Sequence, residues 1–240
     1  MQINRVSSGI PSIDHITDGG FPTGSVISYF GETGSGKTFA SLKFLQVGLK
    51  NKDTTLMITA HHNIPSLKTL GKLINLDLEP ITWVDAANWR TKRIDRTSAS
   101  YSKYEVSDLT DLNALLAMII QAYKDNTDIT RIVFDSLSNL LMYSTPGVEQ
   151  VIRFFELLIA FTRKNQITFI FTIEKNLHLE STISGLHLIS ISIQELEDKD
   201  LKRELTSQYQ KKIYYNHKRW KIKIICIAGF VRSVDTILYT

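Results

Sequence analysis

The chain has 240 residues, 43% of them hydrophobic, with 12 glycines and 5 prolines, so it can bury one substantial core, and we expect a single domain over residues 1–240. The net charge of +4 is modest, and the single cysteine excludes an internal disulfide. No apolar run reaches the roughly 20 residues of a membrane helix and the first ten residues lack the apolar core of a signal peptide, which excludes membrane insertion and predicts a cytoplasmic protein.

Short β-rich runs alternate along the chain with longer amphipathic stretches. This alternation is typical of an α/β fold in which helices flank a mostly parallel twisted sheet. The expected strands are residues 26–30, 55–59, 81–84, 131–134, 167–172 and 188–193. The expected crossover helices, with apolar residues at three- and four-residue spacing, are residues 39–50, 65–74, 109–123 and 148–164.

Two connecting segments carry their own signals. Ser107 or Thr110 can cap the orphan amides at the start of the helix 109–123. Residues 88–106 read NWRTKRIDRTSASYSKYEV, which is polar, basic and without a clear period. This composition predicts a long surface loop that is free to move.

The C-terminal fifth of the chain differs in pattern and charge. Trp220, Ile222 and Ile224 alternate with lysines, which predicts an antiparallel strand with one solvated face, in a hairpin with residues 211–215. Residues 199–223 hold nine Lys or Arg against two Asp or Glu. An anionic partner such as nucleic acid, the nucleotide of a neighbouring subunit, and a merely solvated face all remain open for this basic C-terminal segment.

The stretch GETGSGKT lies between an expected strand and an expected helix, the context that makes a P-loop (Walker A motif) credible. Its glycines let backbone amides form a nest for the phosphates of ATP, beside the positive end of the following helix. Lys37 would neutralise phosphate charge and the Thr38 hydroxyl would be a Mg²⁺ ligand. The residues expected to bind the nucleotide are Gly31, Glu32, Thr33, Gly34, Ser35, Gly36, Lys37, Thr38, Phe39 and Asp135.

Asp135 supplies the second half of such a site. It follows the apolar run IVF, about a hundred residues after the P-loop, where an acidic side chain would hold the metal. An apolar run ending in Asp is weak evidence alone, because Asp also caps helices. Together with the P-loop it predicts a Mg²⁺ site formed by Thr38 and Asp135.

Three stretches resemble the RecA superfamily, in particular its KaiC-like and archaeal RadA-paralogue ATPases. They are SSGIPSIDHITDGGFPTGSVISYFGETGSGKT, RIVFDSLSNLL and WKIKIICIAGFVRS, which together span nearly the whole chain. The resemblance implies a RecA-like core that binds ATP and Mg²⁺. It also implies a homo-oligomeric ring or filament, or assembly with a related partner protein, with nucleotide near the subunit interfaces.

The sequence departs from that family where its catalytic groups stand. One or two glutamates usually follow the strand after the P-loop helix, but here His61 and His62 occupy those positions. An imidazole can act as a base near neutral pH, yet it lacks the negative charge with which a carboxylate polarises water. The alternative, that both histidines simply end a strand, stays open.

Two further positions bear on hydrolysis. Glu174 stands where a polar residue would sense the γ-phosphate; it is either a substitute base or an acid at a helix start, and we favour the second interpretation. The family's trans-acting Lys-x-Arg pair is matched only by Lys211 and Lys212, and lysine cannot form the bidentate fork of arginine.

The sequence therefore leaves ATPase activity uncertain, with His62, His61 and Glu174 as candidate catalytic residues. The leading hypothesis is an ATP-binding regulatory or assembly factor that hydrolyses ATP slowly or not at all. The alternative is a DNA-binding recombination or repair ATPase, whose affinity would fall steeply with salt. A P-loop kinase is disfavoured because no arginine-rich lid follows Asp135.

Overall fold

The computed structural model describes residues 4–95, 97–126, 128–143, 147–175, 177, 191–196 and 221–225. The elements in chain order are β1 (Arg5–Val6), α1 (Pro11–Ile16), β2 (Phe21–Pro22), β3 (Val26–Gly31), α2 (Lys37–Lys50), β4 (Thr54–Thr59), α3 (Ile64–Leu73), β5 (Thr82–Asp85), α4 (Trp89–Ile94), β6 (Tyr104–Glu105), α5 (Leu112–Asp125), β7 (Ile129–Asp135), α6 (Leu137–Tyr143), α7 (Val148–Lys164), β8 (Thr168–Glu174), β9 (Ile191–Leu196) and β10 (Lys221–Ile225). Within these ranges each helix is too short or too polar to cross a bilayer.

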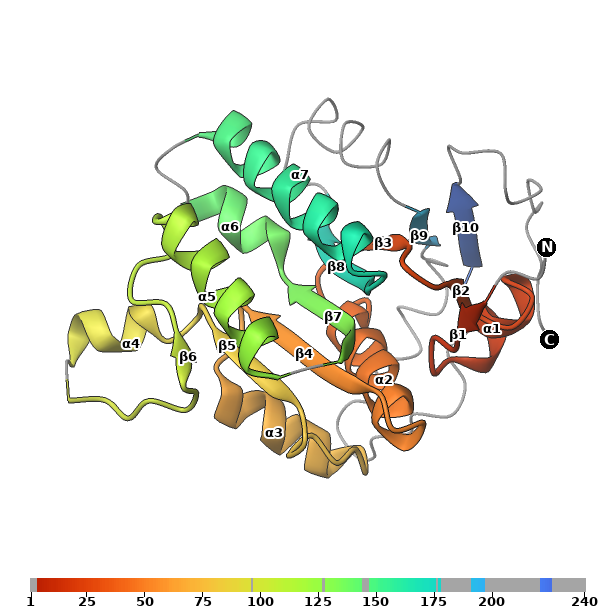
Figure 1. Cartoon of the computed structure of the whole chain (residues 1–240), viewed down its shortest axis with the longest axis horizontal. Coiled ribbons are helices and arrows are strands. Elements are labelled where there is room, and N and C mark those ends of the chain that lie inside the picture. The colour runs from red at the N-terminus through yellow and green to blue at the C-terminus, as the bar shows by residue number, and fades with distance from the viewer. Residues whose placement is uncertain are drawn as a thin grey trace, which may run out of the picture.

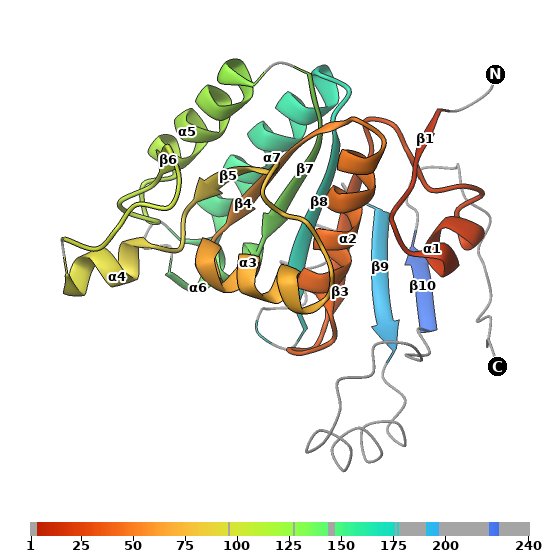
Figure 2. The ribbon, with the colours of Figure 1, turned by 90° about the horizontal axis from the view of Figure 1, so that it is seen from below.

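Eight strands form one sheet in the order β10-β9-β3-β8-β7-β4-β5-β6 (Figure 1). All neighbours run parallel except β10, which is antiparallel to β9. Figure 2 shows β9 and β10 at one end of the sheet and β6 with α4 at the other. The mostly parallel RecA-like sheet with an antiparallel C-terminal strand is therefore confirmed, and β1 with β2 forms a separate small antiparallel pair.

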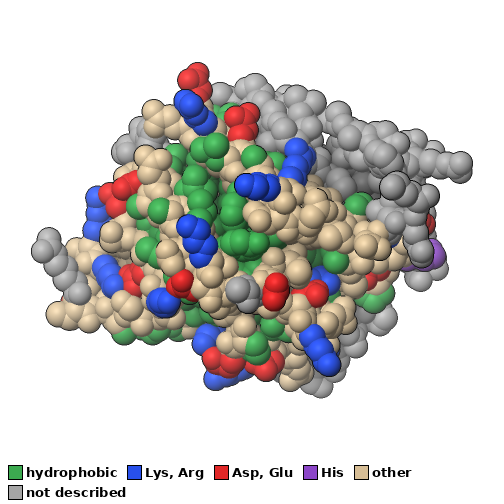
Figure 3. Space-filling model, in the orientation of Figure 1, with side chains coloured by type: hydrophobic (Ala, Val, Ile, Leu, Met, Phe, Trp, Pro, Cys, Tyr) green, Lys and Arg blue, Asp and Glu red, His purple; other side chains and the backbone are tan. Residues whose placement is uncertain are grey.

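The strand pattern buries both faces of the sheet, because successive side chains of a strand point to opposite sides. Ile132 and Phe134 pack against α5, α6 and α7, whereas Val133 between them packs against α2 and α3. The layers are visible in Figure 1, where α5, α6 and α7 lie over one face. On the surface seen in Figure 3, Lys and Arg are interspersed with Asp and Glu around a strip of hydrophobic side chains.

The C-terminal strand is antiparallel to its described neighbour. β10 pairs with β9, Ile224 opposite Ile193, whereas the hairpin partner expected from the sequence, residues 211–215, lies outside the described residues. β9 spans Ile191–Leu196, and the first three residues of the expected strand, 188–190, lie outside the described residues. Most of the basic C-terminal segment, including Lys211 and Lys212, also lies outside the described residues.

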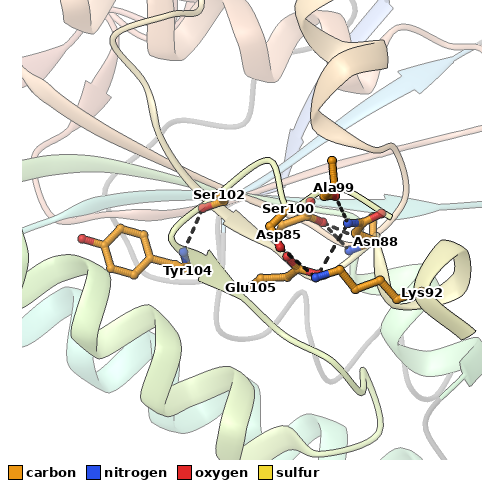
Figure 4. Close-up of polar contacts among 9 residues, drawn as sticks. Asp85, Asn88, Lys92, Ala99, Ser100, Ser102, Tyr104 and Glu105 are labelled. Carbon is orange, nitrogen blue, oxygen red and sulfur yellow. Dashed lines mark hydrogen bonds and ion pairs between the residues drawn. The ribbon is translucent and has the colours of Figure 1, made fainter. Parts of the chain in front are cut away.

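The segment 88–106 is not the structureless loop that its composition suggested, since it contains α4 and β6. Figure 4 shows how polar contacts hold it against the end of β5. Asn88 donates from Nδ2 to the carbonyl oxygen of Ala99 (3.1 Å), and Lys92 forms an ion pair with Glu105 (2.6 Å). The buried Asp85 carboxylate accepts the backbone amides that follow it, and burial raises its pKa. Polar contacts that leave no helical or strand period in the sequence, and of which only Asp85 and Asn88 are fully buried, thus hold the segment against β5.

The start of α5 also differs from the expectation. Neither Ser107 nor Thr110 caps the helix; Asp111 does, by accepting the backbone N–H of Ala114 at 2.9 Å. Thr110 instead donates to Asp108. The helix therefore begins at Leu112, three residues later than the apolar pattern suggested.

Arg131, on β7, is buried to 1% exposure and ties three parts of the chain together. Its Nε lies 2.6 Å from the Asp53 carboxylate, and its Nη1 donates to the carbonyl oxygens of Ser7 (2.7 Å) and Phe44 (3.2 Å). Gly48 makes room for it, because a Cβ there would lie 2.5 Å from Cδ of Arg131. The guanidinium thus joins the N-terminal segment, α2 and the sheet.

Candidate phosphate and metal site

Four parallel strands end at the same edge of the sheet and bring the predicted site residues together. Gly31 at the end of β3 pairs with Glu174 at the end of β8, and Thr59 at the end of β4 pairs with Asp135 at the end of β7. Ligands of open parallel sheets bind beyond the carboxyl ends of the strands. This edge is therefore the candidate site.

The loop between β3 and α2 has the backbone geometry that phosphate binding requires. Gly34 and Gly36 have φ values of +81° and +93°, a region that favours glycine. α2 begins at Lys37 without a side-chain cap, so its first amides point into the loop. Nζ of Lys37 donates to the carbonyl oxygens of Gly31 (2.9 Å) and Glu32 (2.8 Å), which folds the lysine over the same loop.

Asp135 is linked to the loop by a hydrogen bond across the site. The Thr38 hydroxyl donates to Oδ2 of Asp135 at 2.8 Å, and the Thr172 hydroxyl donates to Oδ1 at 2.5 Å. Asp135 is 3% exposed, so its carboxylate is held in a fixed position between α2 and β8. A hydroxyl beside a carboxylate is a hard oxygen donor set, which fits Mg²⁺. Thr172 was not foreseen; its signal was its place near the end of the strand that neighbours β7.

The two histidines follow β4 and face different neighbours. His61 is exposed, and its Nδ1 lies 3.0 Å from Oδ1 of Asn139 on α6. His62 is half-buried and meets the ring of His61 edge to face, with centroids 4.2 Å apart. Burial lowers the pKa of His62, the neighbouring His61 ring lowers it further, and the carboxylates of Asp135 and Glu174 oppose the shift. The lowered pKa favours the neutral form of His62.

Glu174 is the last residue of β8, not the first residue of a helix, which corrects the preferred sequence interpretation. Its carboxylate accepts a hydrogen bond from the Thr33 hydroxyl of the P-loop at 2.9 Å. Its backbone N–H donates to Oγ of Ser138 at 2.8 Å. The carboxylate thus lies against the phosphate loop. Phe39, in the first turn of α2, contributes its backbone there, while its ring faces Lys43.

Comparisons with known proteins identify the family to which the chain is similar. Residues 6–206 match the family model described as the KaiC ATPase. The chain is 32% identical over 142 residues to a UPF0273 protein of Pyrococcus horikoshii, covering 57% of this chain and 56% of that protein. It is 27% identical over 173 residues to the circadian clock protein KaiC3 of Synechocystis, covering 72% of this chain and 33% of that protein.

The matches span little more than half the length of the UPF0273 relatives, 61% of the length for one from Methanopyrus kandleri. The fold is similar to that of a KaiC-like protein of Pyrococcus horikoshii OT3, with a TM-score of 0.70, 20% identity, and coverage of 100% of this chain and 96% of that one. At this identity the likeness bears on the fold alone.

Proposed function

Because the chain belongs to the KaiC family of ATPases, we propose that it binds ATP with Mg²⁺ at residues 31–38 and acts as a nucleotide-dependent regulatory or assembly factor. We further propose that it hydrolyses ATP slowly or not at all. The main support for this binding site is the 2.8 Å hydrogen bond between Thr38 and Asp135. It joins the phosphate loop to a buried carboxylate from a strand two places away in the sheet.

The residues at the site have distinct roles in this proposal. The loop amides and Lys37 bind the phosphates, and Lys37 exchanges its carbonyl contacts within the loop for phosphate oxygens. Thr38 and Asp135 hold Mg²⁺, which would neutralise phosphate charge when bound. Thr172 keeps the Asp135 carboxylate oriented from the opposite side. These assignments use groups that the fold already brings to one edge.

Slow hydrolysis follows from the groups beside this site. The end of β4 presents His61 and His62 where a carboxylate would orient the attacking water, and the lowered pKa of His62 favours its neutral form. A neutral imidazole attracts the proton of water less strongly than a carboxylate does. The Glu174 carboxylate also lies beside the loop, and its hydrogen bond to Thr33 positions it as a sensor of the loop's conformation.

The proposal of regulation by occupancy has a direct test. The full chain is titrated with ATP and Mg²⁺ in a calorimeter, its turnover is measured, and its assembly state is followed by light scattering with and without nucleotide. Tight binding, negligible turnover and an ATP-dependent change of mass are expected. Rapid turnover would remove the regulatory interpretation. An assembly that requires single-stranded DNA would favour a recombination function instead.

Lys37→Ala is expected to weaken ATP binding at least tenfold, which corresponds to roughly 1.4 kcal/mol. The reason is the loss of a charge-assisted contact to phosphate at a partly buried position. Calorimetric titration measures the change. Lys50→Ala, at the exposed far end of the same helix, is the matched control and should leave the affinity unaltered. An unchanged affinity in folded Lys37→Ala would overturn the P-loop assignment.

Asp135→Asn is expected to weaken ATP binding by about tenfold in the presence of Mg²⁺ and by much less in EDTA, because a neutral amide is a poor ligand for this cation. Titrations under the two conditions give the comparison. Equal losses with and without the metal would show that Asp135 acts on the fold through Thr38 and Thr172 and not on Mg²⁺.

A further inference from the structure

Asn139 contacts His61 through its side-chain amide, and the carbonyl oxygen of Ala60 fixes the orientation of that amide. Its Nδ2 lies 3.2 Å from the carbonyl oxygen of Ala60, which can only accept, so this end of the amide is the NH₂ donor. The opposite end, Oδ1, lies 3.0 Å from Nδ1 of His61. Because an amide oxygen can only accept, Nδ1 of His61 is the donor in this pair.

Ser136 holds the same amide from another side. The backbone N–H of Asn139 donates to Oγ of Ser136 at 3.3 Å, and the Ser136 hydroxyl donates to Oδ1 of Asn139 at 3.2 Å. Ser136 and Asn139 are only 3% and 6% exposed. A flipped amide would turn its oxygen toward the Ala60 carbonyl and set two acceptors against each other. The observed orientation is therefore strongly favoured.

We propose that Asn139 is a positioning residue that keeps neutral His61 in the tautomer with hydrogen on Nδ1. Histidine side chains in water favour the other tautomer, with hydrogen on Nε2, so the protein has to impose this one. Nε2 of His61 then carries a lone pair and no hydrogen. It accepts a hydrogen bond from water, but it cannot donate one to a phosphate oxygen while the ring is neutral.

This tautomer adds detail to the proposed function. Its consequence for the nucleotide rests on that proposed function, the binding of ATP at this site. A neutral His61 orders water through Nε2 and gives the phosphates no hydrogen bond from that nitrogen. The ring also lies edge to face against His62, at an interplanar angle of 88°. Asn139 therefore sets both the proton position of His61 and the surface against which His62 packs.

The test reads the imidazole ¹⁵N chemical shifts of the full ¹⁵N-labelled chain at a pH where the rings are neutral. The His61 signals are identified by their loss in His61→Gln. Hydrogen on Nδ1 is expected in the unmodified chain. In Asn139→Leu the tautomer ratio should move toward Nε2–H on the order of fivefold, which is one net hydrogen bond of about 1 kcal/mol.

Asn165→Leu is the matched control. Asn165 has the same pattern, with Nδ2 donating to the Phe161 carbonyl (2.8 Å) and Oδ1 accepting from the Tyr123 hydroxyl (3.2 Å), but it lies at the end of α7. Its substitution should leave His61 unchanged. The inference would be overturned by hydrogen on Nε2 of His61 in the unmodified chain, or by an unaltered tautomer ratio in folded Asn139→Leu. If Asn139→Leu does not fold, the tautomer of the unmodified chain alone decides.

Titration with ATP separates this inference from the proposed function. A chain that shows the Nδ1–H tautomer but binds no ATP supports the role of Asn139 and removes the nucleotide site. A chain that binds ATP with hydrogen on Nε2 of His61 retains the site and refutes the role of Asn139.

Discussion

His62→Glu is expected to raise ATP turnover by roughly 10²-fold over an unmodified chain that turns over near the background rate. A missing general base costs about 10² to 10⁴ in rate, and the substitution places a carboxylate just after β4, where the family resemblance implies a catalytic glutamate. Phosphate release under saturating ATP and Mg²⁺ measures the effect. His61→Glu should gain less, because His61 faces Asn139 on α6.

The same substitution at His15, on α1, is the control and should leave turnover at background. The outcome that contradicts the proposal is rapid turnover in the unmodified chain that survives both His61→Ala and His62→Ala. The base would then lie elsewhere, and Glu174→Gln, at the carboxylate beside the P-loop, should abolish that activity.

Arg131→Leu is expected to lower the free energy of unfolding by about 3 to 5 kcal/mol. The substitution removes a buried donor from the carboxylate of Asp53, which is 26% exposed, and from the carbonyl oxygens of Ser7 and Phe44. Urea unfolding followed by circular dichroism measures the loss, which should appear as a lower midpoint at a similar slope.

Lys68→Met is the matched comparison for Arg131. The Lys68–Glu79 pair is also 2.6 Å long, but its side chains are 31% and 64% exposed, against 1% for Arg131. Exposed pairs contribute about 0 to 1 kcal/mol, so the loss should be small. Similar losses for the two substitutions would mean that burial does not govern the contribution of Arg131.

The sequence predicted the elements whose signals are local and periodic. The helix Val148–Lys164 has the expected limits, and the P-loop and Asp135 lie at one edge as their motifs indicated. Segment 88–106 was misread because its order comes from contacts such as Lys92 with Glu105, which leave no period in the sequence. The burial of Arg131 was also not predictable, because it depends on Asp53 and Ser7, far away in the chain.

In the candidate site, too, the residues that stand in a motif were predictable and those that depend on distant contacts were not. Thr38 and Asp135 were expected as partners, since each stands in a recognisable motif. The contacts of Thr172 with Asp135 and of Asn139 with His61 join residues without a motif, and only the strand order brings them together. The position of Glu174 at a strand end was misjudged because an acidic residue after an apolar run suits a helix start equally well.

The pairing of β3 has a consequence for biosynthesis. Its neighbours are β8 and β9, with Val26 opposite Phe169 and Ile27 opposite Ile191, so no strand made before residue 168 pairs with it. A sheet built on such distant contacts folds slowly, because long loops must close before its central strand is paired. On the ribosome, the nascent chain therefore carries an unpaired, apolar strand 26–31 until β8 emerges. The phosphate loop is therefore completed late, and we expect the nascent chain to be most prone to aggregation in this interval.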